Sequence, residues 1–171
     1  MAVCRTLIRA TGLKGDSVNE CMQYVNSLLC KESVSSMFVT AFYGILNTLT
    51  GEIDYVNAGH NPPYILSSNG IRQVEMTNGL ALGVLDDFNF ESKKIQLNKG
   101  DQLLLYTDGV TEAINLEQTA YGETKFENFL NHHLNLPIET IIKKSFTDVN
   151  DFVAGAPQSD DITLLGITYN G

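Results

Sequence analysis

An unbroken apolar run, Leu103-Leu104-Leu105-Tyr106, places the tightest constraint on how this chain folds. Such runs are typical of strands buried on both faces, whereas strands with one solvated face alternate apolar and polar residues. The run therefore predicts a buried central strand over residues 102–107. Asp108 follows this strand on a stiff scaffold, and Gly109 after it allows another group to approach the backbone.

A second apolar strand is predicted over residues 162–168, and Asp160 and Asp161 directly precede it. If the two strands are antiparallel neighbours, all three carboxylates meet at one edge of the sheet. Clustered carboxylates repel one another, and a hard divalent cation such as Mg²⁺ or Mn²⁺ relieves that repulsion. The pattern alone leaves a second interpretation open, two solvated loop ends, because Asp-Gly is common in turns.

The remaining periodicities predict an α+β fold in which helices cover the sheets. Asp16 or Ser17 is expected to cap the second helix, with Glu20 completing a capping box. The strands at 90–97 and 102–107 are expected to pair with each other. The predicted helices are 2–11, a second one from about residue 18 to 29, 124–134 and 137–153, and the other strands are 37–49, 52–57, 63–67 and 71–75.

Composition narrows the classes of partner. With 171 residues, 43% of them apolar, the chain is predicted to form one globular domain. Eleven Lys and Arg against 20 Asp and Glu give a net charge of −9, which argues against nucleic acid and against anionic membrane surfaces. No apolar run approaches the ~20 residues of a membrane span, and the first residues do not read as a signal peptide.

The three cysteines have no spacing typical of a zinc site or a disulfide framework. Cys4 and Cys21 fall at apolar helical positions and are predicted to be small core residues, whereas Cys30 has no assigned role. Free thiols fit a reducing cytoplasm.

His60 lies in the segment NAGHNPP, which is predicted to form a tight loop between strands. It is either a catalytic acid or ligand, or a residue that holds the loop by hydrogen bonds, and the second role is favoured. His132 and His133 fall on a helix and are predicted to be a surface residue and a residue at the edge of the core. No metal-ligand spacing connects them with His60.

Four segments in fixed order resemble one known family. They are SSMFVTAFYGILNTLTGEIDYVNAGHNPPYIL, LALGV, KGDQLLLYTDGVTEAIN and QSDDITLLGI. The chain resembles the SpoIIE-like (sporulation-protein-E-like) branch of the metal-dependent PPM phosphatases, which are relatives of protein phosphatase type 2C. The resemblance covers roughly residues 1–169.

The resemblance implies a four-layer α-β-β-α sandwich of antiparallel sheets. It also implies hydrolysis of phosphoserine or phosphothreonine by water that bridges two Mn²⁺ or Mg²⁺ ions, with no covalent intermediate. Asp108 and Asp160 match metal ligands, and Asp161 matches a neighbouring position that supports the site. Gly109, His60 and Asn61 are expected to have supporting or structural roles.

The family's partners are implied in the same way. A phosphatase domain of this kind in a bacterial signalling protein is expected behind a sensor or receiver domain. Its expected substrate is a phosphorylated regulatory protein such as an anti-sigma-factor antagonist.

One family motif, an Asp-containing stretch that ends in Ser-Gly-(His/Lys)-Gly, does not occur in the sequence. The chain is therefore expected to be an N-terminally truncated domain over residues 1–171 that lacks the first strands, binds metal weakly and has little activity. Uncovered sheet edges would favour a homodimer or strand exchange. The alternative is a non-catalytic phosphatase-like module that binds other proteins.

Overall fold

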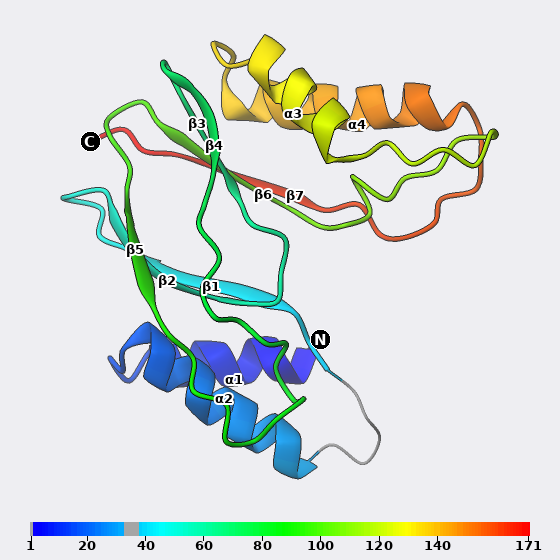
Figure 1. Ribbon diagram of the computed structural model, residues 1–171. Coiled ribbons are helices and arrows are strands. Elements are labelled where there is room, and N and C mark those ends of the chain that lie inside the picture. Colours follow the sequence, from blue (N-terminus) through cyan, green and yellow to red (C-terminus); the bar gives the residue numbers. More distant parts are fainter. Residues whose placement is uncertain (1, 33–37) are drawn as a thin grey trace. The chain divides into compact units, whose positions relative to one another are not determined.

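A computed structural model describes residues 2–32 and 38–171. The chain forms two compact units (Figure 1). The first unit contains the described residues up to His60 together with Glu75–Leu97, and the second contains Asn61–Val74 and Asn98–Gly171. Each unit combines two helices with one antiparallel sheet, which confirms the predicted α+β class.

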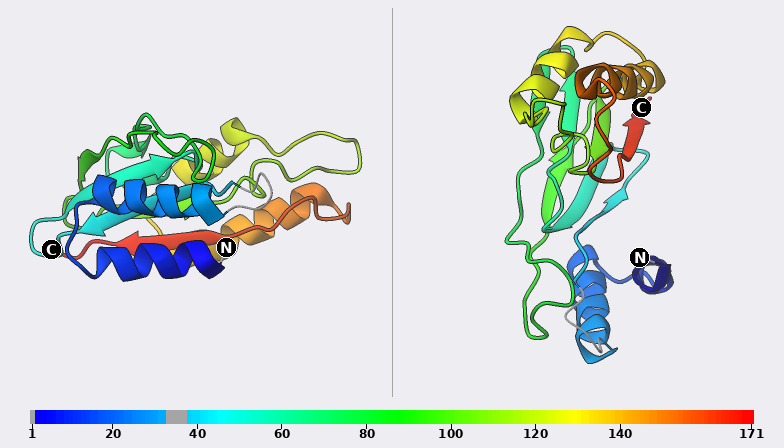
Figure 2. Two further views of the ribbon diagram at one scale, coloured as in Figure 1. Left: turned by 90° about the horizontal axis from the view of Figure 1, so that it is seen from below. Right: turned by 90° about the vertical axis from the view of Figure 1, so that its right-hand side faces the viewer.

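The helices of the first unit form an antiparallel pair. They are α1 (Ala2–Gly12) and α2 (Val18–Glu32), which lie side by side (Figure 2). One half of the predicted capping box is observed at the start of α2, where the Ser17 N–H donates to Glu20 Oε2 at 3.1 Å. Their apolar faces are buried and include Cys4, Cys21, Met22 and Val25.

The sheet of the first unit has the strand order β1-β2-β5. The strands are β1 (Ala41–Leu46), β2 (Glu52–Ala58) and β5 (Lys93–Gln96). β1 is shorter than the predicted 37–49: Asn47 Oδ1 accepts hydrogen bonds from the Leu49 and Thr50 N–H groups, so the turn begins there. Residue 37 lies outside the described residues.

The sheet of the second unit has the strand order β4-β3-β6-β7. Its strands are β3 (Tyr64–Ser67), β4 (Gly70–Gln73), β6 (Gln102–Tyr106) and β7 (Leu164–Thr168). β6 lies between β3 and β7 and buries Leu103, Leu104 and Tyr106, which confirms the predicted central strand.

The predicted pairing of 90–97 with 102–107 is wrong. β5 pairs with β2, and β6 pairs with β3 and β7 in the other sheet. Between β5 and β6, the Asn98 N–H donates to Asp101 Oδ2 at 2.8 Å and the Asp101 N–H donates to Asn98 O at 2.9 Å. This short turn resembles a hairpin turn in sequence, but it connects strands of two different sheets.

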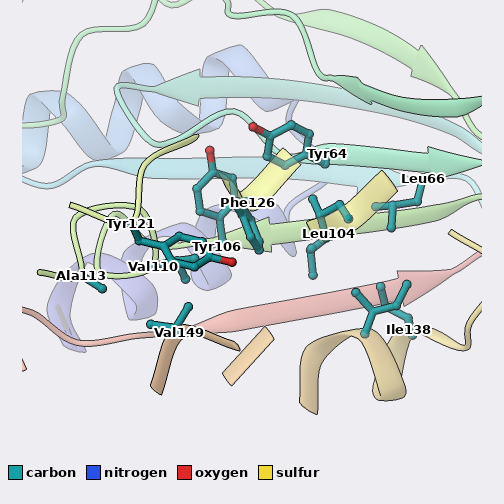
Figure 3. Close-up of a cluster of buried hydrophobic side chains, with 12 residues drawn as sticks. Tyr64, Leu66, Leu104, Tyr106, Val110, Ala113, Tyr121, Phe126, Ile138 and Val149 are labelled. Atoms are coloured by element: carbon teal, nitrogen blue, oxygen red, sulfur yellow. The ribbon is translucent and has the colours of Figure 1, made fainter. Parts of the chain in front are cut away.

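Helices α3 (Glu123–His132) and α4 (Ile138–Val153) cover one face of the second unit's sheet (Figure 1). Pro137 is the N-cap of α4, so the helix begins one residue after the start of the predicted 137–153. Gly166 of β7 lets α4 pack closely, because a Cβ there would collide with the Ile138 side chain. The core between helices and sheet (Figure 3) is rich in aromatic rings, including Tyr64, Tyr106, Tyr121 and Phe126.

None of the helices within 2–32 and 38–171 combines the length and the apolar character needed to cross a bilayer.

Candidate metal-binding edge of the second unit

The candidate site lies where β6 ends and β7 begins. The two strands are antiparallel neighbours, with Tyr106 opposite Leu164, so the chain leaves β6 at the edge where it enters β7. Asp108 follows β6 by two residues, and the pair Asp160-Asp161 precedes β7 by three to four. The arrangement of strands on which the predicted meeting of these carboxylates depended is therefore confirmed.

Thr107 ties the two strand ends together. Its Oγ1 donates a hydrogen bond to the main-chain oxygen of Asp161 at 2.8 Å and accepts one from the Thr163 N–H at 2.9 Å. The Thr107 N–H donates to Thr163 O at 3.1 Å. Sequence reasoning missed this role, although Thr107 is the first hydroxyl residue after the apolar run.

Gly109 brings the turn after β6 against the main chain of Asp160 and Asp161. A Cβ on Gly109 would lie 2.5 Å from the Asp161 main-chain oxygen and 3.3 Å from that of Asp160. Real Cβ atoms do not approach a main-chain oxygen at the shorter distance, so this contact requires glycine. The expected close approach of a second group to Gly109 is therefore observed, and that group is the backbone of the other acidic segment.

The Asp108 carboxylate lies on a well-ordered turn. Its Oδ1 accepts a hydrogen bond from the Gly109 N–H at 3.0 Å, and its main-chain oxygen accepts one from the Glu112 N–H at 2.8 Å. The Thr111 hydroxyl donates to the same main-chain oxygen at 3.3 Å. The backbone of the turn is thus fixed, while the carboxylate faces solvent.

The second acidic segment is also held through its backbone. Asp160 Oδ1 accepts a hydrogen bond from the Asp161 N–H at 2.6 Å, and Gln158 Nε2 donates to Asp160 O at 2.7 Å. The Ser159 hydroxyl donates to Glu112 O at 3.3 Å, which connects this segment with the turn after β6. Both aspartate side chains are exposed and can reach a ligand in solvent.

The charge at this edge is negative on both segments. Residues 107–113 and 157–163 carry the exposed carboxylates of Asp108, Glu112, Asp160 and Asp161 and contain no Lys or Arg. Within the part of the chain that the structure describes, no three His, Cys, Asp or Glu side chains form a group that could hold a metal ion. The oxygen donors fit Mg²⁺ or Mn²⁺, since Mg²⁺ is commonly held by one or two carboxylates with water and substrate phosphate.

The NAGHNPP segment is held by a buried side chain. Asn57 Oδ1 accepts a hydrogen bond from the His60 N–H, and Asn57 Nδ2 donates to His60 O, both at 2.8 Å. These bonds hold the loop backbone and support the predicted structural role of His60, which remains a prediction. Asn61 follows as a half-buried residue in the connection to β3.

The other two histidines lie at the end of α3 and belong to neither of the segments 107–113 and 157–163. His132 is exposed, and His133 is half-buried with its ring centroid 4.3 Å from that of Phe129. These positions match the predicted surface residue and core-edge residue.

Comparison with known proteins identifies the family. The family model for Stage II sporulation protein E (SpoIIE) matches residues 1–170. Among curated proteins, Protein IcfG of Synechocystis sp. is 31% identical over 137 residues, which are 79% of this chain and 21% of that protein. Phosphoserine phosphatase RsbU of Bacillus subtilis is 27% identical over 176 residues, covering 96% of this chain and 50% of the relative.

Solved structures agree with that assignment. The RsbU and RsbW domains of Rv1364c from Mycobacterium tuberculosis match with 28% identity and a TM-score of 0.77, over 97% of this chain and 46% of that one. The SiaA-PP2C domain of Pseudomonas aeruginosa matches in fold, with 15% identity and a TM-score of 0.80, over 98% of this chain and 69% of that one. The chain spans half or less of the length of the two curated relatives. It belongs to the SpoIIE family and has the fold of the PP2C phosphatase domains.

Proposed function

We propose that this chain is part of a metal-dependent protein phosphatase domain that hydrolyses phosphoserine or phosphothreonine. The observation that carries the proposal is the shared edge of β6 and β7, where Gly109 packs against the backbone of Asp160 and Asp161. Membership of the SpoIIE family supports it, as do relatives named phosphoserine phosphatases, RsbU and RsbP.

Asp108 and Asp160 would hold a divalent cation, Mn²⁺ or Mg²⁺, with Asp161 as a supporting residue. Such a cation lowers the pKa of a bound water and polarises a phosphoryl group. The protein's own contribution is position: Thr107 and Gly109 keep the two acidic segments in contact through their main chains. Preorganised ligands avoid the cost of ordering flexible side chains at each binding event.

The carboxylates also explain why the cation is needed. A phosphoserine dianion would meet only negative side chains on residues 107–113 and 157–163. Like charges repel one another, so the phosphate is expected to bind after a cation has neutralised or reversed the local charge. The proposed order is therefore cation first and phosphoprotein second.

The proposed substrate is a phosphorylated regulatory protein of a bacterial signalling system, such as an anti-sigma-factor antagonist, and the proposed compartment is the cytoplasm. A sensor or receiver domain in the same protein would regulate the reaction. The Ser-Gly-(His/Lys)-Gly motif of the family does not occur in these 171 residues. We therefore expect weak metal binding and low turnover from them alone.

A phosphatase assay tests the proposal. The 171-residue chain, and a form extended upstream in its reading frame to include the motif, are incubated with p-nitrophenyl phosphate and with a phosphoserine peptide, with Mn²⁺ or with EDTA. We expect Mn²⁺-dependent turnover from the extended form and little from the shorter chain. Absence of turnover from an extended form that contains the motif would contradict the proposal.

The second candidate is a non-catalytic module that binds other proteins through a phosphatase-like fold. It is favoured by the absence of any group of three potential metal ligands among the described residues. The upstream reading frame separates the two candidates: an in-frame Asp-x-Ser-Gly-(His/Lys)-Gly supports the enzyme, and its absence supports the module.

A further inference from the structure

A small pocket in the second unit lies beside the candidate metal-binding edge. Its volume is about 360 Å³, and it lies between the end of α4, residues 155–162 and the turn after β6. Its walls are mainly apolar and include Ala113, Val149, Val153, Ala156, Pro157 and Ile162. Binding pockets for small ligands are about 300–1,000 Å³, so this pocket has room for one large side chain.

The floor of the pocket is rigid. Val149 is 1% exposed and Ala113 is 4% exposed, and both belong to the aromatic-rich core of the second unit. Val153 and Ile162 pack against the same core and remain partly exposed. The floor of the pocket is therefore fixed, and its wall offers apolar surface that water solvates poorly.

The pocket and the candidate site share two chain segments. Gly109 lines the pocket and directly follows Asp108, while Gln158 and Ser159 line it and directly precede Asp160. An extended peptide advances about 3.3–3.6 Å per residue. A peptide whose phosphoserine lies at the Asp108 and Asp160 carboxylates can therefore reach the pocket within a few residues.

The residues that line the pocket favour some substrate side chains over others by charge and polarity as well as by size. None of the residues that line the pocket is charged, and the neighbouring exposed groups are the carboxylates of Asp108, Glu112 and Asp160. An acidic side chain would be repelled there, whereas an aliphatic or aromatic side chain would bury its surface against Val153 and Ile162. The surroundings thus disfavour acidic residues and favour apolar residues next to the phosphorylated one.

We propose that this pocket binds an apolar side chain located within a few residues of the phosphoserine in the protein substrate. This inference rests on the proposed phosphatase function for the identity of the ligand. It adds a determinant of substrate choice that is separate from the carboxylates.

The test measures peptide binding by NMR, independently of catalysis. Seven-residue peptides with a central phosphoserine carry one Leu, moved through the other positions, in a background of Gly and Ser. Mg²⁺ is present throughout, and an Ala series serves as the reference. Burial of a Leu side chain predicts about tenfold tighter binding at one or two positions. The Leu peptides should shift the methyl signals of Val153 and Ile162, and the Ala peptides should not.

Three variants sharpen the test. Ala156→Phe fills the pocket from an exposed loop, and Val153→Thr makes its wall polar with little change of shape. Both should reduce the preference for Leu to less than about threefold. Asn135→Phe adds the same ring at an exposed site beside Leu136, whose main-chain oxygen accepts a hydrogen bond from Gln102 at the start of β6. It should leave the preference unchanged.

Two results of the Leu scan would contradict the binding of an apolar side chain in this pocket. A flat Leu scan, or a preference that survives both pocket variants, would overturn the proposal. The proposal would also be overturned if the methyl signals of Val153 and Ile162 shifted with protein concentration and not with added peptide. That result would assign the pocket to contact with a second copy of the chain. Hydrolysis of p-nitrophenyl phosphate, which has no flanking residues, tests the phosphatase function separately, so the two ideas can fail independently.

Discussion

The Thr107 hydroxyl donates a hydrogen bond to the main-chain oxygen of Asp161 at 2.8 Å and accepts one from the Thr163 N–H at 2.9 Å. The Thr107 side chain at the end of β6 therefore helps to hold the segment that carries both aspartates before β7, together with the packing of Gly109 and the bond from Ser159 to Glu112. The relative position of the two acidic segments is set by the main chain and does not depend on their exposed carboxylates.

Replacing Thr107 by Val should loosen this connection. The substitution keeps the branched shape but leaves the Thr163 N–H and the Asp161 oxygen without their partner, at a cost of about 1–2 kcal/mol in the free energy of unfolding. Urea denaturation followed by circular dichroism measures the change. Thr107→Ser, which retains the hydroxyl, should lose clearly less, and equal losses in the two variants would show that the hydrogen bonds do not matter.

Gly109→Ala should be more harmful than an ordinary glycine substitution. Its Cβ would lie 2.5 Å from the Asp161 main-chain oxygen, so the two acidic segments must separate, at an expected cost of about 2–3 kcal/mol. Gly100→Ala is the matched control, because Gly100 has φ 91° but no neighbouring atom within 4 Å of the position that a Cβ would take. It should cost about 1 kcal/mol. A loss of less than about 1 kcal/mol for Gly109→Ala would contradict the close packing at Gly109.

Stability should fall steeply in alkaline solution. Burial raises the pKa of the Tyr64, Tyr106 and Tyr121 phenols above their ordinary value of about 10. The unfolded chain therefore releases these protons at a lower pH than the folded chain does. The stabilisation is fully present below pH of about 10 and is lost as the pH rises through the folded-state pKa values.

Urea midpoints measured from about pH 8 to about pH 11 test this dependence, and absorbance of phenolate reports the titration directly. Tyr106→Phe should remove part of the alkaline loss. A urea midpoint that stays constant over the whole pH range would contradict the predicted contribution of the buried phenols to stability.

Thiol labelling should distinguish the three cysteines. Cys4 and Cys21 are buried and Cys30 is half-buried, and burial raises the pKa of all three thiols, so the expected difference in rate comes from access. In the native protein, Cys30 should react with Ellman's reagent at least about tenfold faster than the other two. The Cys30→Ser variant should lose the fast phase, and equal rates for all three thiols in native buffer would contradict the packing of the first unit.

Local pattern predicted much of this structure. The run at Leu103–Tyr106 favoured a buried strand, and the Ser17 and Glu20 spacing marked the start of α2. The pairing of 90–97 was predicted wrongly, because the turn at Asn98–Asp101 looks the same whether the next strand joins the same sheet or another one. The partners of a strand depend on contacts distant in sequence, which single-sequence periodicity does not encode.

In the candidate site, too, local pattern predicted some residues, whereas those that depend on long-range contacts were missed. Asp108, Asp160 and Asp161 could be named because each flanks an apolar strand, and the resemblance to the SpoIIE-like phosphatases favoured the metal interpretation that the pattern alone left open. The roles of Thr107 and of the pocket beside Val153 could not be, since both depend on contacts between segments about 50 residues apart. Nothing in the local pattern around Thr107 or Val153 indicates which distant residue it meets.

Manganese binding by Asp108 and Asp160 is the central claim, and titration followed by electron paramagnetic resonance tests it most directly. Asp108→Asn and Asp160→Asn should each weaken Mn²⁺ binding by about tenfold or more, because each removes a charged ligand. Asp151→Asn, an exposed carboxylate on α4, should leave the affinity unchanged. Unaltered Mn²⁺ affinity in both Asp108→Asn and Asp160→Asn, with the fold intact by circular dichroism, would contradict the assignment of the metal site to this edge.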